Sequence, residues 1–381
     1  DVVEISCHGG PVPLREVLRL ALAAGARQAE AGEFTLRAFL NGRVDLAQAE
    51  AVMAVVSART PESLTLAVEE LRGRLGGRLA PARAALLSAL AYLDASADFP
   101  EDEVPPLDLA RTLRHAAAAL EEVLAGARLG RLFREGVEIA IVGRPNVGKS
   151  SLLNALLGAE RAIVTEIAGT TRDVISETIT LRGIPATLLD TAGIAETEDI
   201  VERIGIDRSR RAIVSAGLAV LVLDGSQPPT EADRAVVRLL ADRLSRDGAG
   251  SERLVVALNK RDLPERHDHA ELLALLPGCP AIALSTVSGA GLPQLEETLY
   301  ARLQAQAGEG REPALVTLRQ QQALARALES TRSALVELSD VPLDLVAVDV
   351  RDALLAVGEI TGEHIGERVL DEIFSRFCIG K

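Results

Sequence analysis

The sequence predicts a doubly wound α/β domain with a mainly parallel sheet, inserted into an α-helical domain and preceded by a truncated α/β N-terminal domain. Helical periodicity of Ala, Leu and Val dominates both ends of the chain. Between them, short β-branched runs alternate with helical stretches, as a buried parallel sheet requires. At 381 residues the chain is long enough for several cores.

The first expected domain spans residues 1–42. Residues 2–6 predict a short strand, and residues 13–24 predict an Ala/Leu-rich helix. The chain begins inside this strand and has no initiator Met. We therefore expect the front part of this domain to be missing.

The helical domain is expected in two parts, residues 43–134 and 307–381, on either side of an α/β domain at residues 135–306. In the first part a Pro-rich, acidic stretch at residues 98–108 predicts a loop between helices. The predicted strands of the α/β domain are the apolar runs at residues 137–142, 186–189, 218–223, 254–258 and 281–284.

The composition argues against several classes of function. A formal charge of -14 disfavours a broad phosphate-binding surface, and 2% aromatic residues with no Trp disfavour a base-stacking platform. Cys7, Cys279 and Cys378 form no C-x-x-C pair, which fits a reducing compartment and gives no zinc site. The sequence has no apolar stretch of roughly 20 residues and no signal-like start. We expect a cytoplasmic chain with no membrane association.

Residues 143–150 read Gly-Arg-Pro-Asn-Val-Gly-Lys-Ser and match the pattern G-x-x-x-x-G-K-S. The pattern follows a predicted strand and opens a predicted helix, where glycines let backbone N–H groups wrap a phosphate. Lys149 would reach the phosphate oxygens, and the Ser150 hydroxyl would bind Mg²⁺. A chance glycine-rich turn is the alternative, which the strand and helix on either side disfavour.

Two further motifs follow predicted strands. Asp190-Thr-Ala-Gly193 would place a carboxylate near Mg²⁺ and a backbone N–H near the γ-phosphate. In Asn259-Lys260-Arg261-Asp262, the last carboxylate can accept from both N1–H and the 2-amino group of guanine, a donor pair that adenine lacks. We therefore predict GTP as the nucleotide. A solvated loop acid is the commoner role of an Asp, but the order and spacing of the motifs disfavour it.

The base pocket is predicted to close through backbone N–H groups at Ser285-Thr286, although Val287 departs from the usual pattern there. The predicted nucleotide contacts are Asn146, Val147, Gly148, Lys149, Ser150, Ser151, Thr165, Glu166, Ile167, Ala168, Gly169, Thr170, Thr171, Asp190, Thr191, Ala192, Gly193, Asn259, Lys260, Asp262, Ser285 and Thr286.

Between the phosphate motifs, Gly169-Thr-Thr-Arg-Asp173 predicts a switch segment whose threonine binds Mg²⁺ only with the γ-phosphate present. A plain Thr/Gly-rich loop is the alternative. Ras-like GTPases orient the attacking water with a Gln after D-x-x-G, whereas Ile194 follows Gly193 here. Glu202 is our candidate for this role, with Lys149 as the other catalytic residue. A solvated Glu at a helix start is an equally supported interpretation of Glu202.

These motifs, in this order, resemble the MnmE (TrmE) family of tRNA-uridine-modification GTPases. The resemblance extends to Gly32-Glu-Phe-Thr-Leu-Arg-Ala-Phe-Leu-Asn-Gly-Arg43, to Val-Glu-Arg-Ile-Gly-Ile from Val201, and to Cys378-Ile-Gly-Lys381. It covers nearly the whole chain. It implies a P-loop GTPase domain inserted into the helical domain, after an N-terminal domain that binds folate and dimerises.

The resemblance also implies K⁺-dependent hydrolysis. A monovalent cation beside the phosphates would supply the charge that an arginine finger supplies elsewhere. Glu202 would orient the water, and two G domains would meet face to face with GTP bound. The implied metal ligands are Ser150 and Thr171 for Mg²⁺, and Asn146, Thr165, Ile167 and Thr170 for K⁺.

The family implies a second ligand, a 5-formyl- or methylene-tetrahydrofolate one-carbon carrier. Glu4, Arg43 and Lys381 occupy the matching positions, and Cys378 lies beside them. Implied partners are tRNA, whose wobble uridine receives an aminomethyl-type group at C5, and an MnmG (GidA)-type flavoprotein that uses FAD and NADH. A homodimer and a heterotetramer with that flavoprotein are expected.

Two alternative functions share part of this evidence. A ribosome-assembly GTPase related to Era or EngA would have the same nucleotide motifs, with a basic RNA-binding appendage in place of the helical frame. A non-catalytic folate-binding scaffold would use GTP only as a conformational switch.

Overall fold

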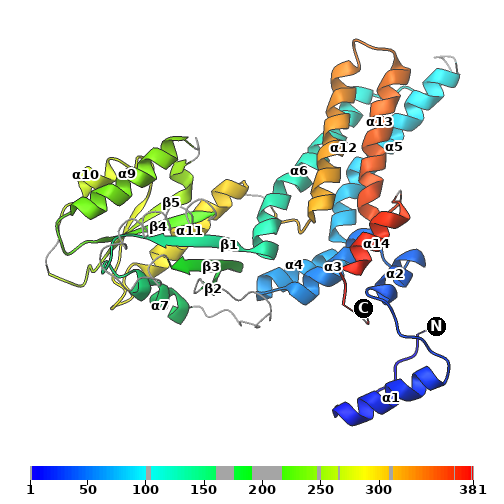
Figure 1. Ribbon diagram of the computed structural model, residues 1–381. Helices are drawn as coiled ribbons and strands as arrows, with labels where there is room; N and C mark the ends of the chain where they lie inside the picture. Colours follow the sequence, from blue (N-terminus) through cyan, green and yellow to red (C-terminus); the bar gives the residue numbers. More distant parts are fainter. Residues whose placement is uncertain are drawn as a thin grey trace.

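The computed structural model describes residues 2–99, 104–159, 176–190, 217–246, 250–264, 267–308, 312–363, 365–378 and 380. Figure 1 shows an α/β body joined to an elongated helical body, with one helix projecting alone near the N-terminus. No helix of the described part is long and apolar enough to cross a membrane.

The α/β body is built on a 6-stranded sheet in the order β2-β3-β1-β4-β5-β6. All neighbouring strands run parallel except β2, which is antiparallel to β3. This confirms the predicted mainly parallel sheet. The strands are β1 (Val137–Val142), β2 (Ser176–Leu181), β3 (Ile184–Asp190), β4 (Leu218–Asp224), β5 (Leu254–Asn259) and β6 (Ala281–Ala283).

Helices cover both faces of the sheet, as the doubly wound prediction requires. Successive residues of β1 enter different cores: Ile139 and Ile141 pack with α7 and α11, whereas Ala140 and Val142 pack with α9 and α10. The helical elements of this body are α7 (Lys149–Ala159), α9 (Glu231–Arg246), the short 3-10 helix η1 (Gly250–Arg253), α10 (Ala270–Leu273) and α11 (Leu292–Ala307).

The helical body has one core made by chain segments on both sides of the α/β body. Leu86, Leu113, Leu324 and Val350 belong to the same buried cluster, although the second pair follows the inserted sheet. This arrangement confirms the insertion. Its helices are α3 (Leu46–Ser57), α4 (Pro61–Leu71), α5 (Arg74–Asp98), α6 (Leu109–Glu135), α12 (Leu318–Glu337), α13 (Leu343–Thr361) and α14 (Glu367–Ser375).

The N-terminal segment corrects one prediction. Residues 2–6 form no strand, and Val2 and Ile5 are 79% and 67% exposed. A strand needs a hydrogen-bonded neighbour, and the described chain offers none here. The predicted helix is present as α1 (Pro11–Ala23), but it buries none of its residues. The next helix, α2 (Glu33–Leu40), packs against α14.

The two connections between the bodies lie against each other. Helix α6 runs directly into β1, and the returning segment crosses α6 where Gly126 and Gly130 have no side chain. The Ala314 N–H donates to the Gly126 carbonyl oxygen at 3.1 Å, and a Cβ on Gly130 would overlap the Ala314 carbonyl oxygen. Leu315 then enters the core beneath the sheet. The entry helix α6 and the exit segment at Ala314 and Leu315 therefore pack against each other, and we call this packed connection the neck.

A buried carboxyl also holds this neck. Glu70, at the end of α4, is 5% exposed and accepts hydrogen bonds from the backbone N–H groups of Leu75 and Leu315. Burial raises the pKa of Glu70 to about 7, against an ordinary value of 4.5. The folded state therefore holds a proton on Glu70 that the unfolded chain releases above pH 4.5.

We predict that Glu70→Gln removes a pH-dependent destabilisation. The folded pKa is the raised one, so the wild type loses folding free energy as pH rises from 4.5 to about 7 and loses no more above it. The shift corresponds to roughly 3 kcal/mol. Denaturant unfolding at pH 5 and pH 8 measures this. The free energy of unfolding of the variant, relative to that of the wild type, should be higher at pH 8 than at pH 5 by about that amount. An equal difference at both pH values would contradict the assignment.

Candidate nucleotide-binding site

The predicted phosphate and base motifs meet at the carboxyl ends of the parallel strands. The glycine-rich loop at residues 143–148 follows β1, Asp190 ends β3, and Asn259 ends β5. In open parallel sheets this edge is where ligands bind. The fold thus brings the predicted phosphate and base motifs to the same edge of the sheet.

Two glycines shape the loop after β1. Gly143 and Gly148 have φ values of 152° and 100°, which side chains rarely adopt. A Cβ on Gly143 would overlap the Val222 carbonyl oxygen, and one on Gly148 would overlap the Asn259 side-chain amide. The loop therefore presents backbone N–H groups at the N-terminus of α7, an arrangement that binds anions.

Lys149 and Asn146 extend this loop. The buried Lys149 ammonium donates to the carbonyl oxygens of Gly143 at 2.9 Å and Arg144 at 2.8 Å, so it lies across the loop. Asn146 is exposed with a φ of 63°, a left-handed conformation that Asn tolerates better than most residues. Ser150 and Ser151 lie exposed in the first turn of α7.

Asn259 connects the loop predicted to bind the phosphates to the loop at Thr286 predicted to close around the base. Its side chain is buried, donates to the Val147 carbonyl oxygen at 2.9 Å and accepts from the Thr286 N–H at 3.2 Å. One side chain therefore satisfies groups from two loops, 112 residues before it and 27 after it.

Asp262 stands exposed at the mouth of the site and is held by Ser285. The Ser285 hydroxyl donates to the Asp262 carboxylate at 2.6 Å, and the same oxygen accepts from the N–H groups of Val287 and Ser288. Ser285 itself is buried. The structure therefore brings Asp262, Ser285 and Thr286 together despite the unusual Val287.

The Asp224 carboxylate also lies at this edge of the sheet, although it was not among the predicted site residues. Asp224 ends β4 and accepts from the Lys260 ammonium at 2.7 Å and from Ser226. Burial raises the pKa of Asp224, but the hydrogen bonds from Lys260 and Ser226 outweigh it and hold the pKa below its ordinary value. Its signal in the sequence was an acid directly after the apolar run at residues 218–223, at the same edge as the other motifs.

Part of the predicted site lies outside the described residues. The segments 160–175 and 191–216 are not described, and Asp190 is described only through its backbone. The predicted contacts that fall there are Thr165, Glu166, Ile167, Ala168, Gly169, Thr170, Thr171, Thr191, Ala192, Gly193 and Glu202, and Lys381 is outside as well.

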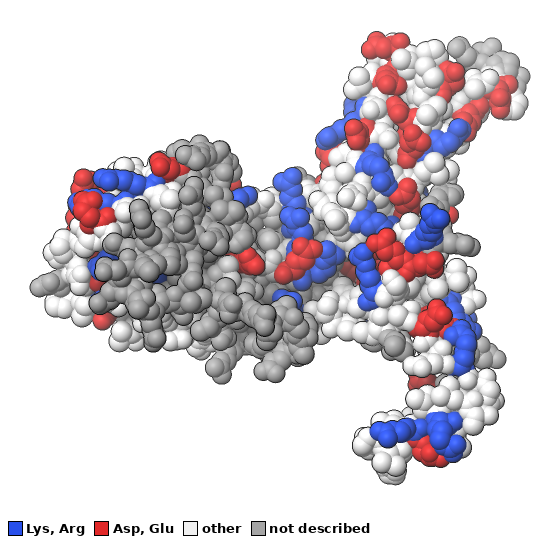
Figure 2. All heavy atoms as spheres, in the orientation of Figure 1, with Lys and Arg blue, Asp and Glu red and all other residues white. Residues whose placement is uncertain are grey.

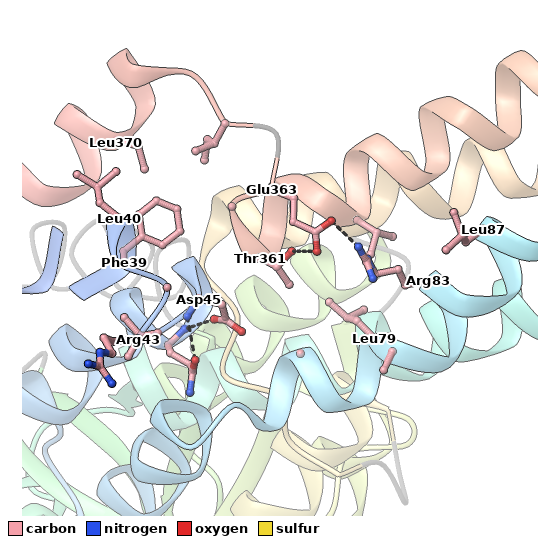
Figure 3. A pocket seen from close by; sticks show the side chains of 18 of the residues that line it. Phe39, Leu40, Arg43, Asp45, Leu79, Arg83, Leu87, Thr361, Glu363 and Leu370 are labelled. Atoms are coloured by element: carbon pink, nitrogen blue, oxygen red, sulfur yellow. Dashed lines mark hydrogen bonds and ion pairs between the residues drawn. The ribbon is translucent and has the colours of Figure 1, made fainter. Parts of the chain in front are cut away.

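The predicted folate residues lie in the other body. Arg43 lines a cavity of about 940 Å³ between the α2–α3 connection, α5 and the end of α13. Figure 3 shows the cavity, with Arg83 paired to Glu363 at 2.6 Å. Glu4 is exposed and is not part of its lining. Cys378 is exposed, and its carbonyl oxygen accepts from the Gly32 N–H at 3.4 Å.

Two family models agree with this organisation. The chain matches the family model of the MnmE helical domain over residues 46–378 and that of the GTP-binding protein TrmE N-terminus over residues 1–43. Among solved structures, the G domain of the T. maritima FeoB iron transporter covers 44% of this chain at 27% identity, with a TM-score of 0.32.

Its curated relatives match over the whole chain. A tRNA modification GTPase MnmE from Roseiflexus castenholzii is 47% identical and covers 100% of this chain and 83% of its own length. The protein of the same name from Heliobacterium modesticaldum is 47% identical, with 82% of its own length covered, and that from Geobacter sulfurreducens is 46% identical. The chain therefore belongs to the MnmE family of tRNA modification GTPases.

Proposed function

We propose that this chain binds and hydrolyses GTP as part of the modification of a tRNA uridine. The observation that supports it most is the pair of hydrogen bonds made by Asn259, which join the predicted phosphate loop to Thr286. Thr286 directly follows Ser285, whose hydroxyl holds the Asp262 carboxylate suited to guanine. The family relationship supports the tRNA part of the proposal.

Guanine recognition rests on Asp262. The Ser285 hydroxyl occupies one side of its carboxylate and leaves acceptor capacity for the N1–H and the 2-amino group of guanine. Adenine presents no such donor pair. The described geometry thus favours GTP over ATP.

Hydrolysis is assigned to groups around the phosphates. The loop's N–H groups, Lys149 and the Ser150 hydroxyl fit a phosphate chain with Mg²⁺, which would neutralise charge on the β- and γ-phosphates. Lys149 would add fixed positive charge. By family resemblance, Thr171 would complete the Mg²⁺ ligands, and Glu202 would orient the water. Asn146, Thr165, Ile167 and Thr170 would hold K⁺.

We predict that Asp262→Asn changes base specificity. An amide donates where the carboxylate accepted, so GTP affinity should fall by about 100-fold or more, while xanthosine triphosphate should gain affinity through its C2 carbonyl. Equilibrium titration with both nucleotides measures this. Asp268→Asn, an exposed acid nearby, is the matched control and should bind as wild type does. Unchanged preference in Asp262→Asn would exclude its role.

We predict that replacing K⁺ by Na⁺ at equal ionic strength slows GTP turnover by about tenfold or more, because ligands spaced for K⁺ would not hold the smaller Na⁺ as a fixed charge beside the phosphates. Asn146→Ala should turn over GTP equally slowly in either salt. Asn154→Ala, on the exposed face of α7, should retain the K⁺ effect. Equal wild-type rates in both salts would rule out the K⁺ site.

The folate carrier and the partners complete the proposal. Arg43 would bind an anionic part of a tetrahydrofolate one-carbon donor in the cavity that it lines. Glu4 and Lys381, with Cys378 beside them, are further ligands by family resemblance only, and Glu4 lies outside this lining. Acidic and basic side chains are mixed over the helical body in the view of Figure 2, without a broad basic face. This suits a tRNA held jointly with an MnmG-type flavoprotein carrying FAD and NADH.

We predict that 5-formyl-tetrahydrofolate binds the chain with measurable heat in calorimetry, and that Arg43→Ala reduces the affinity by about tenfold or more, because a charge-assisted contact is removed. Arg351→Ala is the matched control, since Arg351 pairs with Asp94 on the exposed face of the bundle. Identical heats in wild type and Arg43→Ala, or none in wild type, would contradict the folate site.

A further inference from the structure

Four charged side chains form a continuous series beside the nucleotide loops. The Arg144 Nε donates to both carboxylate oxygens of Asp233 at 3.1 Å, and its Nη2 lies 3.8 Å from an oxygen of Asp224. The same Asp224 oxygen accepts from Lys260 at 2.7 Å. Arg144 belongs to the phosphate loop and Lys260 to the base loop. The series therefore connects the phosphate loop to the base loop through Asp224 and Asp233, which belong to neither sequence motif.

Both carboxylates are fixed by the connection between β4 and α9. The side chains of Asp224 and Asp233 are 1% and 4% exposed. Asp224 accepts from the N–H and hydroxyl of Ser226, and Asp233 accepts from the N–H and hydroxyl of Thr230. Buried carboxylates with local donors and a cationic partner hold a fixed position.

Arg144 connects the fixed carboxylate of Asp233 to Lys149, a residue expected to contact the phosphates. Its side chain is held by Asp233 and by Gln227 at 3.1 Å, and its own carbonyl oxygen accepts from the Lys149 ammonium. A displaced Arg144 would therefore move an acceptor of the lysine that faces the phosphates. Lys260 acts in the same way on the base loop, where its left-handed backbone, φ 67°, directly precedes Arg261 and Asp262.

We propose that Asp224 and Asp233 are positioning residues for the nucleotide: through Lys260 and Arg144 they hold the base loop and the phosphate loop at one spacing, and so set the residence time of bound guanine nucleotide. This rests on the proposed GTP binding. Neither carboxylate contacts the reacting atoms, and Lys149 keeps its second acceptor, the Gly143 carbonyl oxygen. The main effect therefore falls on nucleotide release, and the chemical step changes less.

The test uses Asp224→Asn and Asp233→Asn, which keep the shape of the side chain and remove its charge. Dissociation of fluorescent GDP from the full chain should become about 10- to 100-fold faster, with kcat at saturating GTP within about threefold of wild type. Asp242→Asn, an exposed acid on α9, is the matched control and should release GDP at the wild-type rate.

A double-mutant cycle separates positioning from general stability. Arg144→Gln should accelerate GDP release at least as much as Asp233→Asn does. The double variant should release GDP no faster than Arg144→Gln alone, because Arg144→Gln already removes the contact that Asp233→Asn removes. Additive effects, or a loss of kcat equal to the loss of affinity, would overturn the proposal. If the aspartate variants fail to fold, Arg144→Gln alone provides the test. GDP release from Arg144→Gln at the wild-type rate would also overturn the proposal. Wild type that binds no GDP would refute the proposed function itself.

Discussion

The candidate site depends on the two hydrogen bonds made by the Asn259 side chain. This side chain is buried where β5 ends, and its two hydrogen bonds connect the loop after β1 to the loop after β6. An amide can do this because it donates and accepts at once, which a carboxylate or an ammonium cannot. Gly148 is required by the same contact, since a side chain there would overlap the Asn259 amide. The loops predicted to bind the phosphates and the base thus share one buried side chain.

The second constraint is the neck that joins the two bodies. The chain enters the sheet through α6 and returns across Gly126 and Gly130 of that helix, so both connections are packed against each other. The β2–β3 hairpin adds a third contact, because the Thr60 hydroxyl at the start of α4 donates to the Gly183 carbonyl oxygen at 2.7 Å. This hairpin lies between the predicted switch segment and the Asp190–Gly193 motif in the sequence, and Thr60 connects it to the helical body.

The sequence predicted the features that depend on local pattern. Strands β1, β3, β4, β5 and β6 are apolar runs, and β4 and β5 are buried along almost their whole length. The glycine-rich loop directly follows β1, and Asn259 is the last residue of β5. It did not predict β2, an edge strand in which polar and apolar residues alternate, and it wrongly predicted a strand at residues 2–6, where no neighbour is present. The Arg144–Asp233 pair and the Gly130–Ala314 contact could not be predicted, because each joins segments that meet only in the folded chain.

The most direct test of the nucleotide site is an equilibrium titration of the intact chain with GDP and with ADP in the presence of Mg²⁺. Because the Asp262 carboxylate matches a donor pair that only guanine presents, GDP should bind at one site per chain, and ADP at least about 100-fold more weakly. Equal affinities for the two nucleotides, or no binding of GDP, would contradict the assignment of this sheet edge as a guanine-nucleotide site.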